Sequence, residues 1–270
     1  MQTNRPLENR IAVITGASAG IGRAAALTLA HAGAAVVVNA RRAERLDELV
    51  TEITQARGRA TAVPGDAAES AVIARTLDAA KATFGADADL VIVNAGRGLS
   101  GSPTTSDEAQ WEEMVRLNLI GAARLVRAAA ERMVKIVPEP RAGANTPASD
   151  PWLTRPRDIV LLGSTVGKHI SPFSSMYGST KFALNSIAEA VRRELAPKGI
   201  RVSSISPAIV RSEFQGVAGY DPAKFGAFMD SVGPVLEPDD IARLILFMVS
   251  QPASVCINDV VIRPTRQEYP

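Results

Sequence analysis

Short apolar runs and longer segments of helical period alternate along nearly the whole chain. The apolar runs predict strands at residues 11–15, 35–39, 60–66, 89–96, 158–164, 200–207 and 259–264. Between them apolar residues recur every three or four positions, which predicts helices at 20–33, 41–57, 68–84, 107–136, 175–196 and 237–250. Because the strands are apolar on both faces, we expect an α/β fold: a doubly wound parallel sheet of about seven strands, covered by helices on each side.

Residues 138–157 depart from this alternation, with five prolines and little periodicity. They predict a long irregular loop rather than a linker between domains. The loop enters the following strand at its N-terminal end, whereas ligands of such sheets bind beyond the C-terminal ends, so we expect it to be peripheral. The length of 270 residues and the 46% hydrophobic content allow one large core, and we expect a single domain over 1–270. Residues 211–236 mix glycines with aromatics and are expected beside the substrate, as a mobile lid or a static wall.

Composition narrows the classes of function. A net charge of +2 and only 4% aromatic residues argue against a nucleic-acid partner. The single Cys256 cannot form an intrachain disulfide, and His31 and His169 lie far apart, so we expect a metal-free protein of a reducing compartment. The first apolar run is too short for a signal sequence or a membrane span. We therefore expect a cytoplasmic protein without membrane contact.

A glycine-rich turn, TGASAGIG, follows the first predicted strand and leads directly into a helix. Its glycines let the backbone approach a phosphate, while the helix N-terminus supplies free N–H donors and partial positive charge. Taken alone, such a turn is equally typical of a β–α connection without a ligand, but its place at the first strand favours a dinucleotide. The turn residues expected to bind the cofactor are Gly16, Ser18, Ala19, Gly20, Ile21 and Gly22.

The end of the second strand indicates which dinucleotide binds. An acid about 20 residues beyond the glycines would hold a free ribose 2′-hydroxyl, but Ala40 stands there. Arg41 and Arg42 follow and can bind a 2′-phosphate, which favours NADP over NAD; the other interpretation is that they open a solvated helix. Asp66, followed by Ala67, ends the third strand and either accepts a hydrogen bond from the adenine amino group or caps the next helix.

Tyr177 and Lys181 form the most suggestive pair of side chains. The chain has only three tyrosines and six lysines, yet these two lie four residues apart and so share one face of a predicted helix. A free tyrosine has a pKa near 10, and a nearby ammonium together with an oxidised nicotinamide would lower it toward neutrality. The pair therefore suggests acid–base chemistry, although alone it is more typical of a helix surface.

Five motifs occur in an order that identifies a family. They are TGASAGIG, NAG at 94–96, LNLIG at 117–121, GS at 163–164 and YGSTK at 177–181. With them, the chain resembles the short-chain dehydrogenase/reductase family over nearly its whole length. The resemblance implies a single Rossmann-type domain, a nicotinamide cofactor and a homo-oligomer, either a tetramer or a dimer.

The resemblance also implies a catalytic tetrad of Asn118, Ser164, Tyr177 and Lys181. In the family, the tyrosine is the general acid/base, the serine hydrogen-bonds the substrate oxygen, the lysine holds the nicotinamide ribose, and the asparagine helps hold a water that links the lysine to solvent. By the same resemblance, Asn94 braces the central strands, and the two residues after it, Ala95 and Gly96, face the cofactor.

One region departs from the family pattern. After the sixth strand the family usually has Pro-Gly, whereas here Pro207 is followed by Ala208. Ile209 is expected to meet the nicotinamide carboxamide through its backbone, and Ser212 stands where a threonine is common.

The sequence thus predicts an NADP-dependent oxidoreductase that interconverts a small-molecule carbonyl and a secondary alcohol. It does not indicate the substrate or the direction of reaction. The alternative is a catalytically silent nucleotide sensor or scaffold protein on the same fold. The four filled tetrad positions argue against it, because a sensor does not need Tyr177.

Overall fold

The computed structural model describes residues 5–136 and 151–269. All seven predicted strands are present in one parallel sheet of order β3-β2-β1-β4-β5-β6-β7, which confirms the doubly wound fold. Each observed strand lies within one residue of its predicted range or inside it. The strands are β1 (Ile11–Thr15), β2 (Ala35–Ala40), β3 (Arg59–Pro64), β4 (Leu90–Val93), β5 (Asp158–Leu162), β6 (Arg201–Pro207) and β7 (Asp259–Ile262).

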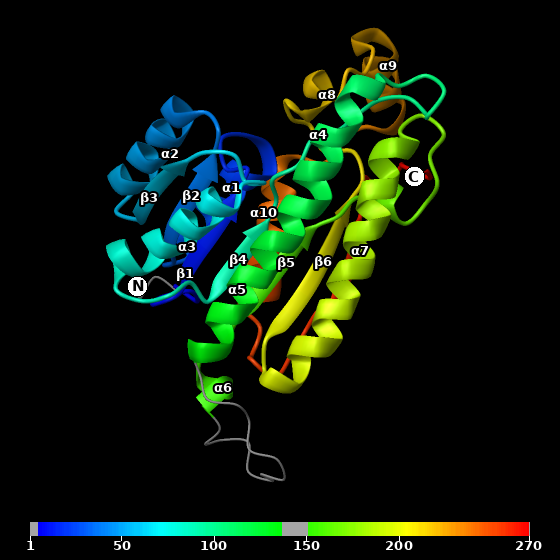
Figure 1. Ribbon diagram of the computed structural model, residues 1–270. Coiled ribbons are helices and arrows are strands. Elements are labelled where there is room, and N and C mark those ends of the chain that lie inside the picture. Colours follow the sequence, from blue (N-terminus) through cyan, green and yellow to red (C-terminus); the bar gives the residue numbers. More distant parts are fainter. Residues whose placement is uncertain (1–4, 137–150, 270) are drawn as a thin grey trace.

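Helices cover both faces of the sheet (Figure 1). One face packs against α1 (Gly20–His31), α2 (Ala43–Gln55) and α10 (Pro238–Val249), and the other against α3 (Ser70–Phe84), α5 (Ala122–Ile136) and α7 (Ser175–Leu195). Side chains alternate between the two cores along each strand: in β1, Ala12 and Ile14 join the first core, and Ile11 and Val13 the second. Within the described ranges, no helix is long and apolar enough to cross a membrane.

The helix predicted over 107–136 is interrupted. It consists of the short turn η1 (Glu108–Gln110), α4 (Trp111–Val115), the π-helical turn η2 (Arg116–Gly121) and α5. The π turn lies close against the turn that precedes α3, because a Cβ on Gly121 would come within 2.8 Å of the Ala68 Cα. Such turns insert one extra residue and are frequent at functional sites, and this one contains Asn118.

The predicted irregular loop 138–157 is described only from residue 151, and its earlier part lies outside the described residues. The described part includes a short helix, α6 (Pro151–Thr154), which the sequence did not predict. Trp152 packs beside Gly199, just after the turn η5 (Ala196–Lys198), where a Cβ would meet the indole at 2.9 Å. α6 lies beyond one end of the sheet, and α8 (Phe214–Val217) and α9 (Pro222–Val232) lie beyond the other (Figure 1).

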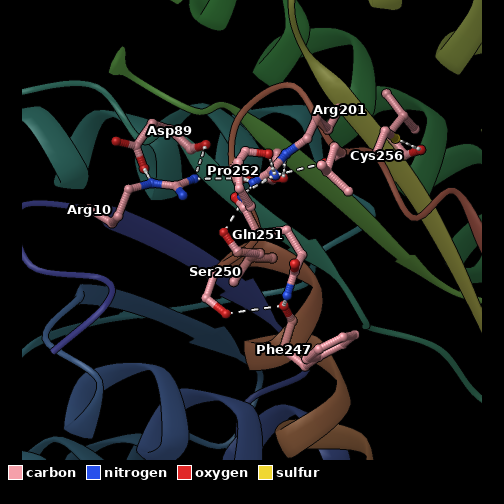
Figure 2. Close-up of polar contacts among 12 residues, drawn as sticks. Arg10, Asp89, Arg201, Phe247, Ser250, Gln251, Pro252 and Cys256 are labelled. Carbon is pink, nitrogen blue, oxygen red and sulfur yellow. Dashed lines mark hydrogen bonds and ion pairs between the residues drawn. The ribbon is translucent and has the colours of Figure 1, made fainter. Parts of the chain in front are cut away.

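Four charged side chains are buried together at the N-terminal ends of the central strands (Figure 2). Arg10 donates from Nε to Asp89 Oδ1 and from Nη2 to Asp158 Oδ2, both at 2.7 Å. Arg201 donates to the same Asp158 from Nε at 2.7 Å and from Nη2 at 2.9 Å. The network therefore joins the starts of β1, β4, β5 and β6, which are neighbours in the sheet.

Arg201 also connects the sheet to the last long helix. Its guanidinium donates to the carbonyl of Val249, which ends α10, and to those of Gln251, Pro252 and Val255 beyond it, at 2.9–3.0 Å (Figure 2). An arginine has five N–H donors, and this set of acceptors satisfies a charge that would otherwise be costly to bury.

Asp158→Ala should lower the free energy of unfolding by about 3–5 kcal/mol, because it leaves two buried guanidiniums without their shared counterion. Urea denaturation monitored by circular dichroism measures the change. Glu131→Ala is the matched control, since it breaks the solvent-exposed pair of Arg127 and Glu131 and should leave the free energy of unfolding almost unchanged. Equal losses in the two variants would contradict the structural role given to Asp158.

Candidate active site

A cavity of about 1140 Å³ opens at the C-terminal ends of β1, β4, β5 and β6. The segment 211–236, which contains α8 and α9, contributes part of its wall. All the predicted site residues line this cavity except Gly22 and Asn118. Its volume exceeds the roughly 300–1,000 Å³ of a pocket for one small ligand, so a cofactor and a substrate fit together. Among the residues described, no three His, Cys, Asp or Glu side chains gather to hold a metal ion.

The glycine turn forms one end of the cavity. Gly16 has φ +68°, and a Cβ there would lie 2.8 Å from Asn94 Nδ2, so only glycine fits. Gly22 does not line the cavity; a Cβ on it would come within 2.4 Å of the Gly16 carbonyl oxygen, so its role is to let α1 start close against the turn. The N-cap residue of α1 is Ala19, which has no side-chain oxygen to occupy the first N–H groups. The turn therefore fits the pyrophosphate of a dinucleotide.

Asn94 braces this turn from β4. Its Nδ2 donates to the Thr15 carbonyl at 2.9 Å and to the Gly16 carbonyl at 3.3 Å. The Thr15 hydroxyl in turn accepts from the backbone N–H groups of Asn94 and Ala95 at 3.2 and 3.1 Å. These bonds join the C-terminal end of β1 to that of β4, its neighbour in the sheet. The sequence indicates the asparagine but not Thr15, because a threonine at the end of a strand belongs to no motif.

The adenosine of the cofactor is expected at the end of the cavity next to β2. Two arginines lie there, and each faces a carboxylate. Arg42 Nη1 lies 2.7 Å from Glu213 Oε2, and its Nη2 donates to the Ser18 hydroxyl at 3.0 Å. Arg41 Nη1 lies 3.5 Å from Glu113 Oε1. Both arginines line the cavity. Neither carboxylate was singled out from the sequence, because both partners are distant along the chain.

Asp66 is held by partners on both oxygens. Its Oδ1 accepts from the Ala68 N–H at 2.9 Å, and Oδ2 forms an ion pair with Arg116. Burial raises the pKa of Asp66, but the Ala68 N–H, the hydrogen bond from Arg116 and that guanidinium's charge together hold the pKa below its usual range. The predicted capping role is wrong, because the N-cap of α3 is Glu69 and no side chain caps the helix; Asp66 instead fixes the turn that precedes it, and its contact with adenine stays a prediction.

Tyr177 lies at the other end of the cavity and is only 7% exposed. Its ring packs on Phe214, with the ring centroids 5.4 Å apart. Burial raises the pKa of the Tyr177 phenol well above its usual value, a hydrogen bond with the Ser164 hydroxyl lowers it, and the nearby Tyr220 raises it further. Ser164 stands between β5 and the turn η4 (Thr165–Gly167), so the strand end places it on the wall of the same cavity as Tyr177.

Lys181 is buried beside Tyr177, with its Nζ 5.7 Å from the centroid of the tyrosine ring. The ammonium donates to the Leu162 carbonyl, at the end of β5, at 2.7 Å. Burial lowers the pKa of Lys181 to about 8. The sequence predicts that Lys181 lowers the pKa of Tyr177. In the structure, burial dominates the pKa of Tyr177, and Lys181 is not one of the groups that shift it. That part of the argument therefore stays a prediction for the complex with cofactor.

Asn118 lies behind the cavity and is fully engaged by the protein. Its Oδ1 accepts from the Arg97 N–H at 2.8 Å, and its Nδ2 donates to the Arg97 carbonyl at 2.8 Å and to the Thr180 hydroxyl at 3.1 Å. Thr180 in turn donates to the Tyr177 carbonyl at 2.7 Å. Asn118 therefore connects the π turn, the segment after β4 and α7. The water-holding role implied by the family resemblance remains a prediction, and Thr180 is a partner that the sequence did not indicate.

The C-terminal segment also reaches the cavity, which the sequence did not predict. Gln267 Oε1 accepts from the Ile209 N–H at 3.2 Å, and Gln267 and Tyr269 both line the cavity. The Ile209 amide is the group expected to meet the nicotinamide, so in this structure the tail provides its acceptor. The two residues are 58 positions apart in an otherwise polar tail, and no motif connects them.

Comparisons with known proteins agree with this geometry. The short chain dehydrogenase model matches residues 10–144, and the Enoyl-(Acyl carrier protein) reductase model matches residues 144–262. An uncharacterized oxidoreductase of Staphylococcus aureus (strain MW2) is 31% identical over 258 residues, covering 96% of this chain and 98% of that protein.

Two solved structures carry a bound nicotinamide dinucleotide. The 3-ketoacyl-(acyl-carrier-protein) reductase from Brucella melitensis, complexed with NADH, aligns with a TM-score of 0.81 at 26% identity, over 96% of this chain and 99% of that one. The closed form of serine dehydrogenase, complexed with NADP⁺, aligns with a TM-score of 0.81 at 27% identity, over 96% of each chain.

Fold, cavity and relatives together define an NAD(P)-dependent dehydrogenase or reductase. The chain belongs to the short-chain dehydrogenase/reductase family. The predicted family and class of enzyme are therefore confirmed.

Lys181→Met should stabilise the protein at pH 7, because the buried ammonium is charged below its pKa of about 8. An unfolded chain keeps that proton up to the usual lysine pKa of 10.5, so between pH 8 and 10.5 the unfolded state binds more protons and wild-type stability rises with pH. The advantage of the variant should shrink over this window by on the order of 3 kcal/mol.

Urea unfolding of both proteins at pH 7 and pH 10 measures this change. Lys81→Met, which alters an exposed lysine on α3, is the control and should follow the wild-type profile. An advantage of Lys181→Met that stays constant with pH would show that lost or gained packing, rather than the buried charge, causes the difference.

Proposed function

We propose that this protein is an NADP-dependent oxidoreductase that interconverts a carbonyl and a secondary alcohol, with Tyr177 as general acid/base. The observation that carries the proposal is the shared cavity, which is lined both by the glycine turn and by Ser164, Tyr177 and Lys181 at and beside the end of β5. A silent nucleotide sensor would need the turn but not this second polar centre. The proposal treats residues 211–236 as the substrate side of the same cavity.

The proposed chemistry divides between cofactor and protein. A bound nicotinamide supplies or accepts the hydride at the substrate carbon. Ser164 hydrogen-bonds the substrate oxygen, and Tyr177 gives that oxygen a proton during reduction or takes the proton during oxidation. The raised pKa keeps Tyr177 protonated at neutral pH, which is the form that reduction requires. The positive charge of Lys181 would favour the phenolate that oxidation requires.

The preference for NADP is supported by the charge at the end of β2. Ala40 supplies no carboxylate for a ribose 2′-hydroxyl, and Arg41 and Arg42 line the cavity directly after it. The related structures do not decide the matter, since one carries NADH and the other NADP⁺. The proposal therefore depends on the two arginines of this chain.

The substrate side of the cavity carries several apolar side chains beside polar ones such as Asp221 and Lys224. Its wall includes Val166, Phe214 and Phe225, and also Phe173 and Phe228, which are 74% and 37% exposed. Covering apolar surface stabilises a complex by roughly 25 cal/mol per Å². We therefore include in the proposal a substrate whose carbonyl bears an aromatic or branched aliphatic group, to be sought by nicotinamide absorbance with panels of such carbonyls and alcohols.

Tyr177→Phe should lower kcat on the best such substrate by at least about a hundredfold, because it removes the proton that Tyr177 transfers. The Kd of the cofactor, measured by calorimetry, should change less than about threefold, since only one hydroxyl is lost. Ser179→Ala removes a hydroxyl from the exposed side of the same helix and should leave kcat unchanged. Near wild-type turnover by Tyr177→Phe would reject the mechanism.

Arg41→Ala should weaken the binding of NADP by about tenfold and that of NAD by less than twofold, because only NADP carries a 2′-phosphate. Titration of each cofactor into wild type and variant gives the four constants. Arg45→Ala, on the helix α2 that follows Arg41 but outside the cavity, controls for the loss of one positive charge. Equal weakening of both cofactors by Arg41→Ala would assign this arginine a structural role only.

A further inference from the structure

A short strap of residues 211–217, between β6 and the end of α8, crosses the glycine turn. A Cβ on Gly20 would lie 3.3 Å from the Ser212 Cβ, so the strap lies directly over the turn. Gln215 stiffens it by donating from Nε2 to the Val210 carbonyl at 2.7 Å and accepting from the Ser212 N–H at 3.3 Å. The strap thus has a defined shape over the start of α1, where the pyrophosphate site lies.

Glu213 fastens this strap to the adenosine end of the cavity. Its Oε2 lies 2.7 Å from Arg42 Nη1, while Arg42 Nε and Nη2 both donate to the Ser18 hydroxyl at 3.2 and 3.0 Å. The residues come from three separate parts of the chain: the strap, the end of β2 and the glycine turn. Both charged side chains are about half exposed, so a ligand in the cavity can reach the guanidinium.

The other arginine is held differently. Arg41 lies 3.5 Å from Glu113, and the same Glu113 also forms an ion pair with Arg97. Arg97 provides that carboxylate with a second cation, so the hold on Arg41 is weaker. A carboxylate of the protein therefore neutralises the charge of Arg42 more completely than that of Arg41.

We infer that Glu213 is a specificity-determining residue, whose carboxylate competes with the cofactor's 2′-phosphate for Arg42 and so limits the preference for NADP over NAD. The inference rests on the proposed place of Arg42 at the 2′-phosphate. A phosphate carries more negative charge than a carboxylate and has three acceptor oxygens, so it displaces Glu213 and releases the strap. NAD has no charge at that position and leaves the ion pair closed.

The sharpest probes are adenosine 2′,5′-bisphosphate and adenosine 5′-monophosphate, which differ only in the 2′-phosphate and need no turnover. Calorimetry gives the ratio of their dissociation constants. Glu213→Gln should raise the preference for the bisphosphate about fivefold, the effect of one nearby charge in a water-like medium. Glu237→Gln is the matched control: it breaks the similarly exposed 2.9 Å pair with Arg211, on the same strap, and should leave the ratio within twofold.

A second measurement follows the strap itself. Hydrogen exchange of residues 211–217 in the wild type should accelerate with the bisphosphate and not with the monophosphate, while in Glu213→Gln it should be fast with either. Strap exchange that is equally slow with both ligands in the wild type would overturn the release.

Arg42→Ala separates this inference from the function on which it rests. If Arg42→Ala lowers the preference for the bisphosphate but Glu213→Gln leaves it unchanged or lowers it, the inference is overturned and the preference for NADP stands. If Arg42→Ala leaves the ratio unchanged, Glu213 has no 2′-phosphate to compete with, and the inference falls. If Arg41→Ala also has no effect, the proposed preference for NADP falls with it.

Discussion

The carboxylate of Asp158 holds two guanidiniums inside the protein, and four neighbouring strands start at these charges. Each arginine is buried, so neither can be solvated in another position without opening the core. In a parallel sheet, alignment of the strand starts also aligns the strand ends. These strands are anchored at their N-terminal ends, so three groups at the C-terminal ends reach the same cavity: the glycine turn after β1, Asn94 after β4 and Ser164 after β5.

The chemical groups of the cavity depend on a dry environment. Tyr177 and Lys181 are both nearly inaccessible to solvent, and burial displaces their pKa values in opposite directions: it keeps the phenol protonated and makes the ammonium easier to deprotonate. The lysine remains tied to the Leu162 carbonyl, and Asn118 holds the neighbouring backbone through Arg97 and Thr180. The polar centre is thus positioned by protein contacts before any ligand arrives.

The sequence was sufficient for the sheet because each strand is a short apolar run, and for most of the cavity because its motifs end those strands. It failed where distant segments determine local structure. The π turn around Asn118 packs closely against Ala68, which is distant in sequence, and α6 occurs in a proline-rich segment without periodicity. The pairing of Glu213 with Arg42 joins residues 171 positions apart, and no local pattern indicates such a contact.

The buried ion network and the cavity lie at opposite ends of the same strands, a separation of about 16 Å for a five-residue strand such as β5. In many enzymes, variants selected for heat resistance lose turnover because the same residues serve both properties. Here the two sets of residues do not overlap. Directed evolution could therefore strengthen the ion network at the N-terminal ends of the strands while the cavity at their C-terminal ends is altered for new substrates. Beneficial changes at the two ends should combine additively.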